Sequence, residues 1–87
     1  METRVAILAV IVRESSSVAA LNDLLHQYSG CIIGRMGLPY REKGLSIISV
    51  AMDAPTDVIS ALSGKIGRRP GITAITVYAP NETEKNL

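Results

Sequence analysis

The run of residues 3–13 constrains the fold of this chain more than any other feature. It is rich in Val and Ile, and apolar residues occupy both the odd and the even positions between Val5 and Val12. Successive side chains of a β-strand point to opposite faces, so a strand of this composition is covered on both faces. We therefore expect residues 3–13 to form a central strand of a sheet.

The same run does not have the character of a signal peptide or of a membrane span. Glu2 precedes it and Arg13 and Glu14 follow it directly, whereas a signal peptide carries its apolar region between a basic start and small residues. The run is also much shorter than the roughly 20 residues that cross a bilayer. Cys31 is the only cysteine, which excludes an intrachain disulfide and fits a reducing compartment. We expect a cytoplasmic protein with no membrane partner.

Helical spacing of apolar residues predicts the next element. The hydroxyl groups of Ser15, Ser16 and Ser17 are candidate helix caps, and Gly30 marks the end. The apolar positions with helical spacing between them are Val18, Leu21, Leu24, Leu25 and Tyr28.

A hairpin of two strands follows, over residues 31–40 and 45–52, with residues 41–44 as the turn. Pro39 has no N–H for a sheet ladder and is tolerated mainly in edge strands. We therefore expect residues 31–40 to lie at one edge of the sheet.

A second helix and a last strand complete the pattern. Asp53 and Thr56 are candidate caps, and Pro55 suits a first helical turn. The apolar stripe of this helix comprises Val58, Ile59, Leu62 and Ile66, before Gly67. Residues 72–79 form the last strand, so residues 1–80 make a single domain and residues 81–87 a polar, flexible tail.

This order predicts an α+β, ferredoxin-like β-α-β-β-α-β sandwich with an antiparallel sheet of order 4-1-3-2 and two helices on one face. The other face is then open in one chain, although the first strand is apolar at both parities. The simplest cover is a second copy, as a homodimer or homotetramer. The alternative is a slip in the register of that strand. The sequence does not say which parity of the first strand faces outward.

Composition and motifs argue against several functions. The formal net charge of +1 gives no general attraction to nucleic acid, so no direct nucleic-acid binding is expected. No nucleophile motif, phosphate loop or dinucleotide fingerprint occurs. One His and one Cys, His26 and Cys31, complete no metal site within one chain. We expect no enzyme activity, no cofactor and no metal, and a site shared between subunits stays open.

Two arrangements suggest an anion site. On an extended strand Arg35, Gly37, Pro39 and Arg41 share one face, where two guanidinium groups flank a surface that glycine leaves open. The alternative is an edge strand blunted against aggregation by Arg and Pro.

The second arrangement is a basic end of the domain. Three connections emerge at one end of this fold, and the N-terminus of the first helix opens there beside Ser15, Ser16 and Ser17. Basic residues gather at that end, namely Arg13, Arg41, Lys43, Lys65, Arg68 and Arg69. Acidic residues fall near the other end, namely Glu2, Asp53, Asp57, Glu82 and Glu84. We expect an anion to bind between Ser15–Ser17 and Arg41 or Arg68 and Arg69, unless these side chains stay solvated and pair with Glu14 and Glu42.

Residues 34–49, with residues 62–67 and 70–72, resemble the iron-only hydrogenase system regulators. Domains of that family are ACT-like and similar to the C-terminal domain of the nickel-responsive repressor. The resemblance implies a regulatory role near hydrogenase maturation in an anaerobe, with small ligands bound at subunit interfaces near the first loop. The chain lacks that repressor's histidine-rich nickel site and its DNA-binding arm, which argues against nickel sensing and direct DNA binding.

Three functions are weighed on this basis. The first is a homo-oligomeric regulatory module that binds a small anionic effector or a partner protein. The second is a structural or adaptor subunit that docks a hydrogenase maturation protein. The third is a small acylphosphatase-like enzyme, which needs a phosphate-binding Arg beside a water-orienting Asn. None of Asn22, Asn81 and Asn86 is expected in such a place.

Overall fold

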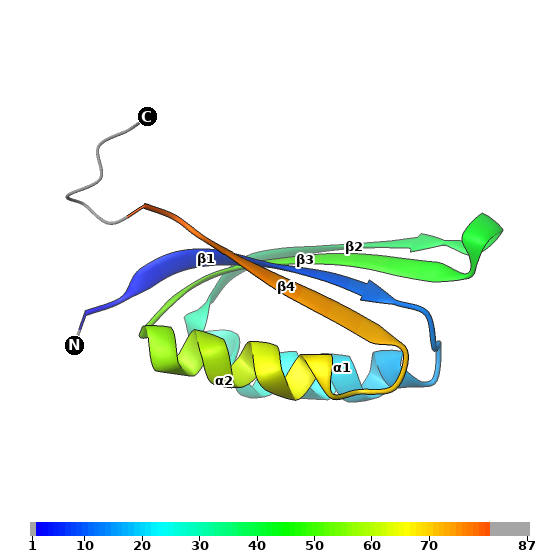
Figure 1. The fold of residues 1–87 in the computed structure, drawn as a ribbon, viewed down its shortest axis with the longest axis horizontal. Helices are drawn as coiled ribbons and strands as arrows, with labels where there is room; N and C mark the ends of the chain where they lie inside the picture. The colour runs from blue at the N-terminus through cyan, green and yellow to red at the C-terminus, as the bar shows by residue number, and fades with distance from the viewer. Residues whose placement is uncertain (1, 81–87) are drawn as a thin grey trace.

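The computed structural model describes residues 2–80 and confirms the predicted order of elements (Figure 1). The strands and helices are β1 (Arg4–Val12), α1 (Ser17–Gln27), β2 (Ile32–Tyr40), β3 (Leu45–Ala54), α2 (Thr56–Gly67) and β4 (Ile72–Tyr78). Two short 3-10 turns, η1 (Ser29–Cys31) and η2 (Arg41–Lys43), lie before and after β2. The residues predicted to form the polar tail, 81–87, lie outside the described residues.

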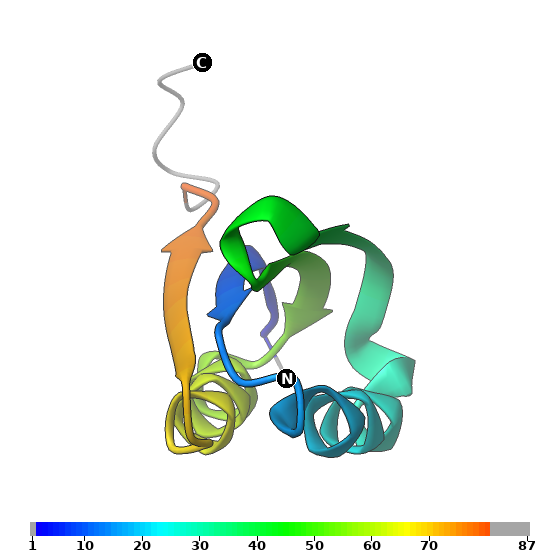
Figure 2. The same cartoon turned by 90° about the vertical axis from the view of Figure 1, so that its right-hand side faces the viewer.

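The four strands form one antiparallel sheet of order β2-β3-β1-β4, which is the predicted 4-1-3-2 order. Both helices cover the same face of this sheet (Figure 2). β1 and β3 are central, and β2 and β4 are the edges. Pro39 therefore lies in an edge strand, where its missing N–H is tolerated.

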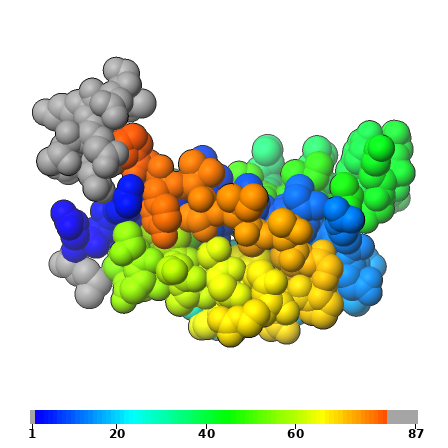
Figure 3. Space-filling model, in the orientation of Figure 1, coloured from blue at the N-terminus to red at the C-terminus, as the bar shows by residue number. Residues whose placement is uncertain are grey.

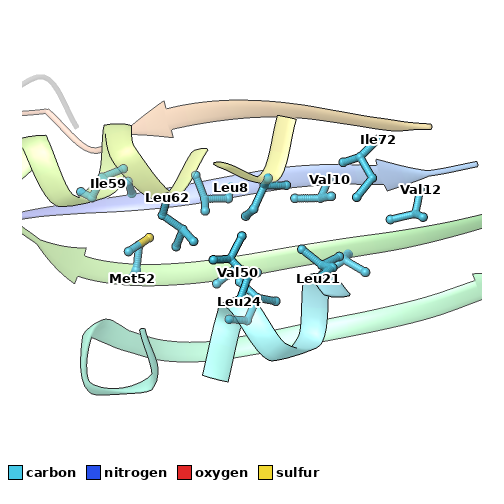
Figure 4. Close-up of a cluster of buried hydrophobic side chains, with 14 of the residues drawn as sticks. Leu8, Val10, Val12, Leu21, Leu24, Val50, Met52, Ile59, Leu62 and Ile72 are labelled. Atoms are coloured by element: carbon cyan, nitrogen blue, oxygen red, sulfur yellow. The ribbon is translucent and has the colours of Figure 1, made fainter. Parts of the chain in front are cut away.

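The core lies between the sheet and the two helices (Figure 4). The even positions of β1 face the helices, and Leu8 and Val10 are at most 1% exposed. Leu21 and Leu25 of α1 and Leu62 of α2 meet them from the other side. The predicted apolar stripes of both helices are thus confirmed as core, with Val18, Tyr28 and Val58 packed at its border.

Only one face of β1 is buried within a single chain. Val5 and Ile7, at odd positions, are 43% and 45% exposed, while their even neighbours Ala6 and Leu8 are at most 1% exposed. The sequence could not choose between these two sets because both are apolar.

The candidate helix caps are placed differently from the prediction. Asp53 belongs to β3 and Thr56 is the first residue of α2, so Pro55 occupies the N-cap position and no side chain caps the helix. β3 runs two residues beyond the predicted end because Asp53 and Ala54 still pair with β1. At α1, Ser16 occupies the N-cap position but makes no capping bond.

Candidate functional site

Three connections meet at one end of the sheet, as predicted (Figure 1). They are the β1–α1 loop, the β2–β3 turn and the α2–β4 loop. The β2–β3 turn, which contains η2, projects beyond the other two. We call this end, with Ser15, Ser16, Arg41, Arg68 and Arg69, the basic end.

Two of these connections are bonded to each other. The Arg13 backbone N–H donates to the Gly71 carbonyl at 2.7 Å, and the Ser17 hydroxyl donates to the Pro70 carbonyl at 2.8 Å. Gly71 has φ of 69° and packs against Glu14, where an added Cβ would lie 2.7 Å from the Glu14 Cβ. The β1–α1 and α2–β4 loops are therefore joined at the basic end by two hydrogen bonds and by the packing of Gly71 on Glu14.

Ser17 differs from its two neighbours. It is buried at 5% exposure, and its hydroxyl hydrogen is already donated to Pro70. Ser15 and Ser16 are exposed. Of the three predicted serines, Ser17 is thus a structural link between loops, and Ser15 and Ser16 are the two that a ligand can reach.

The basic side chains at this end are mostly exposed. Arg68 follows α2 and its Nε donates to the Gly64 carbonyl at 3.2 Å, and Arg69 is exposed beside it. Arg41 is exposed in η2. Lys65 instead turns toward α1, where its Nζ donates to the Tyr28 hydroxyl at 2.9 Å and lies 5.3 Å from the centre of that ring.

The predicted face of β2 is confirmed only in part. Arg35, Gly37 and Pro39 share the helix side of the strand, opposite Val50, Ile48 and Ser46 of β3. Arg41 does not continue this row, because the chain leaves the extended conformation at η2. The structure therefore does not place Arg35 and Arg41 on one strand face.

Arg35 meets an asparagine that the sequence did not place beside it. Its Nη2 donates to Asn22 Oδ1 of α1 at 2.7 Å, and both residues are exposed. In an acylphosphatase-like enzyme the asparagine amide would orient a water, but here the Asn22 amide oxygen accepts the bond from Arg35. This contact joins the edge strand β2 to α1, which covers the same side of the sheet.

The helix-free side of the sheet, which we call the open face, gathers most of the exposed apolar side chains. Of nine large hydrophobic side chains exposed among residues 2–80, eight lie on it, as the strand registers show. They are Val5, Ile7, Met36, Leu38, Tyr40, Ile47, Ile75 and Val77. Ile33, the ninth, lies in the irregular start of β2. Asp53 is the single charged residue at the open-face positions of the four strands.

The sequence contained a signal for this apolar face in the edge strands, although not for the side that the helices cover. In β2 and β4 the larger apolar residues alternate with small or polar ones, as at Met36 and Leu38 and at Ile75 and Val77. The strand register connects Ile75 to Ala9 and Val77 to Ile7 of β1. Alternation in the edge strands thus marks an apolar face, but the strand register that connects this face to the odd positions of β1 comes from the structure.

Two further candidates lie between α1 and β2. His26 is exposed in the last turn of α1, and Cys31 is partly buried in η1. Within residues 2–80, no group of three or more His, Cys, Asp or Glu side chains is arranged to hold a metal ion. In the same part of the chain, no helix is long and apolar enough to cross a membrane.

Comparison with known proteins adds a family. The family model described as "TM1266-like: Iron-only hydrogenase system regulator, putative" matches residues 4–76. Among solved structures, the chain is similar to the uncharacterized protein TM1266 from Thermotoga maritima, with 36% sequence identity and a TM-score of 0.87. That match covers 91% of this chain and 100% of the other. No curated protein matches the chain.

Proposed function

This chain belongs to the TM1266-like family, described as regulators of the iron-only hydrogenase system, and we propose that it is a regulatory module that acts as a homo-oligomer through its open face. A small anionic effector binds at the basic end and alters the assembly. The family description names a regulatory role and no reaction, which supports a binding function over an enzymatic one.

The open face is the observation that carries the proposal. The exposed fractions of its eight large apolar side chains add up to about four whole residues. With on the order of 150–200 Å² for a fully exposed residue of this size, that is roughly 600–800 Å². The largest apolar patch of a typical monomer is about 300–600 Å², and a standard interface buries about 800 Å² per partner. The open face is therefore large enough for a stable dimer.

A second copy is the occupant that this surface fits best. The face is nearly uncharged, so it offers no complementarity to a charged partner and carries little charge to repel an identical surface. A domain of 87 residues also buries only about 60–65% of its unfolded surface, so it gains stability from additional burial. Two identical sheets that pack face to face bring two nearly uncharged surfaces together and bury additional apolar area.

The exposed groups at the basic end are the ones that would hold the effector. Ser15 and Ser16 lie at the start of α1, where the positive end of the helix dipole favours a negative ligand. Arg68 and Arg69 follow in the α2–β4 loop, which the Ser17–Pro70 bond fixes to the start of α1. Arg41 lies in the β2–β3 turn at the same end of the sheet, and Arg35 and Gly37 offer the second surface along β2.

A lysine on the open face tests the assembly. We expect Met36→Lys, at a position 67% exposed on β2, to abolish the open-face contact, as measured by light scattering after size exclusion. The matched control is Ala61→Lys, at an exposed position of α2, which should leave the mass unchanged.

A wild-type chain that remains monomeric at micromolar concentration would overturn the homo-oligomer. It would favour the second function, an adaptor whose open face docks a hydrogenase maturation protein. The acylphosphatase-like alternative predicts that the chain hydrolyses an acyl phosphate. If this activity were present and were lost in Arg35→Ala, Arg35 and Asn22 would be the phosphate-binding and water-orienting residues.

A further inference from the structure

Among residues 2–80, the backbone N–H and C=O groups on the outer edge of β4 have no bonded partner. The Arg13 N–H bonds to the Gly71 carbonyl, and the Ala79 N–H bonds to the Val5 carbonyl, so odd-numbered residues of β4 point their backbone groups at β1. Antiparallel pairing alternates, and even-numbered residues therefore point their N–H and C=O groups outward. In β4 these are Ala74, Thr76 and Tyr78, while the Ile72 N–H is already bonded to Arg69.

This edge has none of the features that usually prevent pairing with another strand. Residues 72–78 contain no Pro, Gly or charge, and five of the seven are Ile, Val or Thr, with Ala74 between them and Tyr78 at the end. The opposite edge strand, β2, has Pro39, Arg35 and a register irregularity near Gly34. Natural sheets protect their edges with such residues and irregularities. Only β2 is protected in this way.

The surface beside β4 also permits a close approach. In Figure 3, β4 runs uncovered along the surface above α2. Thr76 Oγ1 donates to Ser63 Oγ at 3.1 Å, which identifies the side of α2 that lies next to this edge. Residues on that side at helical spacing are all small and uncharged, namely Thr56, Ser60, Ser63 and Gly67.

We propose that β4 pairs with β4 of a second copy, antiparallel about a two-fold axis at Thr76. In that register Thr76 faces its own equivalent and Ala74 faces Tyr78, so every outward N–H and C=O of these three residues is paired. Ile75 then lies opposite Val77 on the open-face side, which extends that apolar surface across the axis. The two α2 helices approach each other through their small residues.

This inference rests on the proposed function for its full consequence. Pairing of β4 edges is one two-fold contact and packing of open faces is another, and two such contacts close a tetramer when their axes are perpendicular and intersect. We therefore infer four copies in the assembly, in which a sheet continues across each pair of β4 strands. The same edge contact alone gives two copies.

Ser60→Arg tests the edge, with Ala61→Arg as its matched control. Both positions are exposed on α2, but only Ser60 lies on the side next to β4. We expect the wild type and Ala61→Arg to have the mass of four chains and Ser60→Arg that of two. Ala74→Pro, which removes an outward N–H and spares the pairing with β1, should also give two.

Amide hydrogen exchange supplies a second readout. In the wild type the N–H groups of Ala74, Thr76 and Tyr78 should exchange at least about tenfold more slowly than in Ser60→Arg. Ile75 and Val77, which bond to β1, should be equally protected in both proteins. Rapid exchange at Thr76 in the wild type, or an unchanged mass in Ser60→Arg, would overturn the edge pairing.

Failure of the open-face contact gives a different result. Met36 lies on β2, at the other edge of the sheet from β4. If the edge pairs and the open face does not, the wild type has two chains, Met36→Lys leaves that mass unchanged and the Thr76 N–H stays protected. If the open face pairs and the edge does not, the wild type has two chains and Met36→Lys has one.

Discussion

The Ser17 hydroxyl donates a 2.8 Å hydrogen bond to the carbonyl oxygen of Pro70, which lies 53 residues later in the chain. The bond joins the first turn of α1 to the loop between α2 and β4. A run of three serines before a helix suggests capping, but here the third one instead fixes two distant loops together.

Replacing Ser17 with Ala should destabilise the protein. The residue is 5% exposed, and loss of its hydrogen bond should lower the free energy of unfolding by about 1 kcal/mol. Urea denaturation at a fixed protein concentration measures it. Ser16→Ala is the control, because Ser16 is exposed and makes no capping bond, and its effect should stay within about 0.5 kcal/mol. Equal losses in the two variants would contradict the structural role of Ser17.

Gly71→Ala should be more damaging than Gly44→Ala. Both glycines have left-handed φ angles, 69° and 64°, which cost a residue with a side chain about 1–2 kcal/mol. At Gly71 the new Cβ also meets the Glu14 Cβ at 2.7 Å and the Glu14 nitrogen at 3.0 Å, whereas at Gly44 nothing lies within 4 Å. We expect a loss of about 3 kcal/mol or more for Gly71→Ala. Similar melting temperatures for the two variants would contradict the close contact.

The anion site predicts a binding difference. Titration calorimetry with phosphate should show binding to the wild type that weakens as salt increases, and at least about tenfold weaker binding to the Arg41→Ala, Arg68→Ala double variant. Arg35→Ala tests the second surface, on β2. A loss only in Arg35→Ala would move the site to β2, and equal binding by all three proteins would exclude both surfaces.

Metal content is a separate test. We expect elemental analysis of the purified protein to give much less than one iron, nickel or zinc per chain, because His26 and Cys31 are too few ligands for a first coordination shell. A stoichiometric metal would contradict this. If it were lost in both His26→Ala and Cys31→Ser, the site would lie between subunits.

The sequence sufficed for the order of elements and for the topology. Helical spacing in α1 and α2 set their buried stripes, and Pro39 placed β2 at an edge, because these patterns reflect local geometry and backbone chemistry. The prediction that three connections share one end of the sheet is also confirmed, since the up-and-down strand order fixes which connections lie together.

Contacts between distant side chains could not be obtained in the same way. Arg35 bonds to Asn22 of α1, Arg41 leaves the strand at η2, and Asp53 stays in β3 and does not cap α2. The first of these depends on where α1 lies beside β2, and the other two depend on where a strand ends. Spacing along the chain does not encode the position of a neighbouring element or the exact end of a strand.

The sequence by itself determined that β1 is a central strand, apolar on both sides, and predicted that a partner covers the side without helices. Only the tertiary structure decided which side that is. Both helices pack on the even positions of β1, so Val5 and Ile7 are left on the open face beside Val77 and Ile75. The physical reason is that a strand alternates with period two, and when both parities are apolar the choice between them comes from the elements that pack against it.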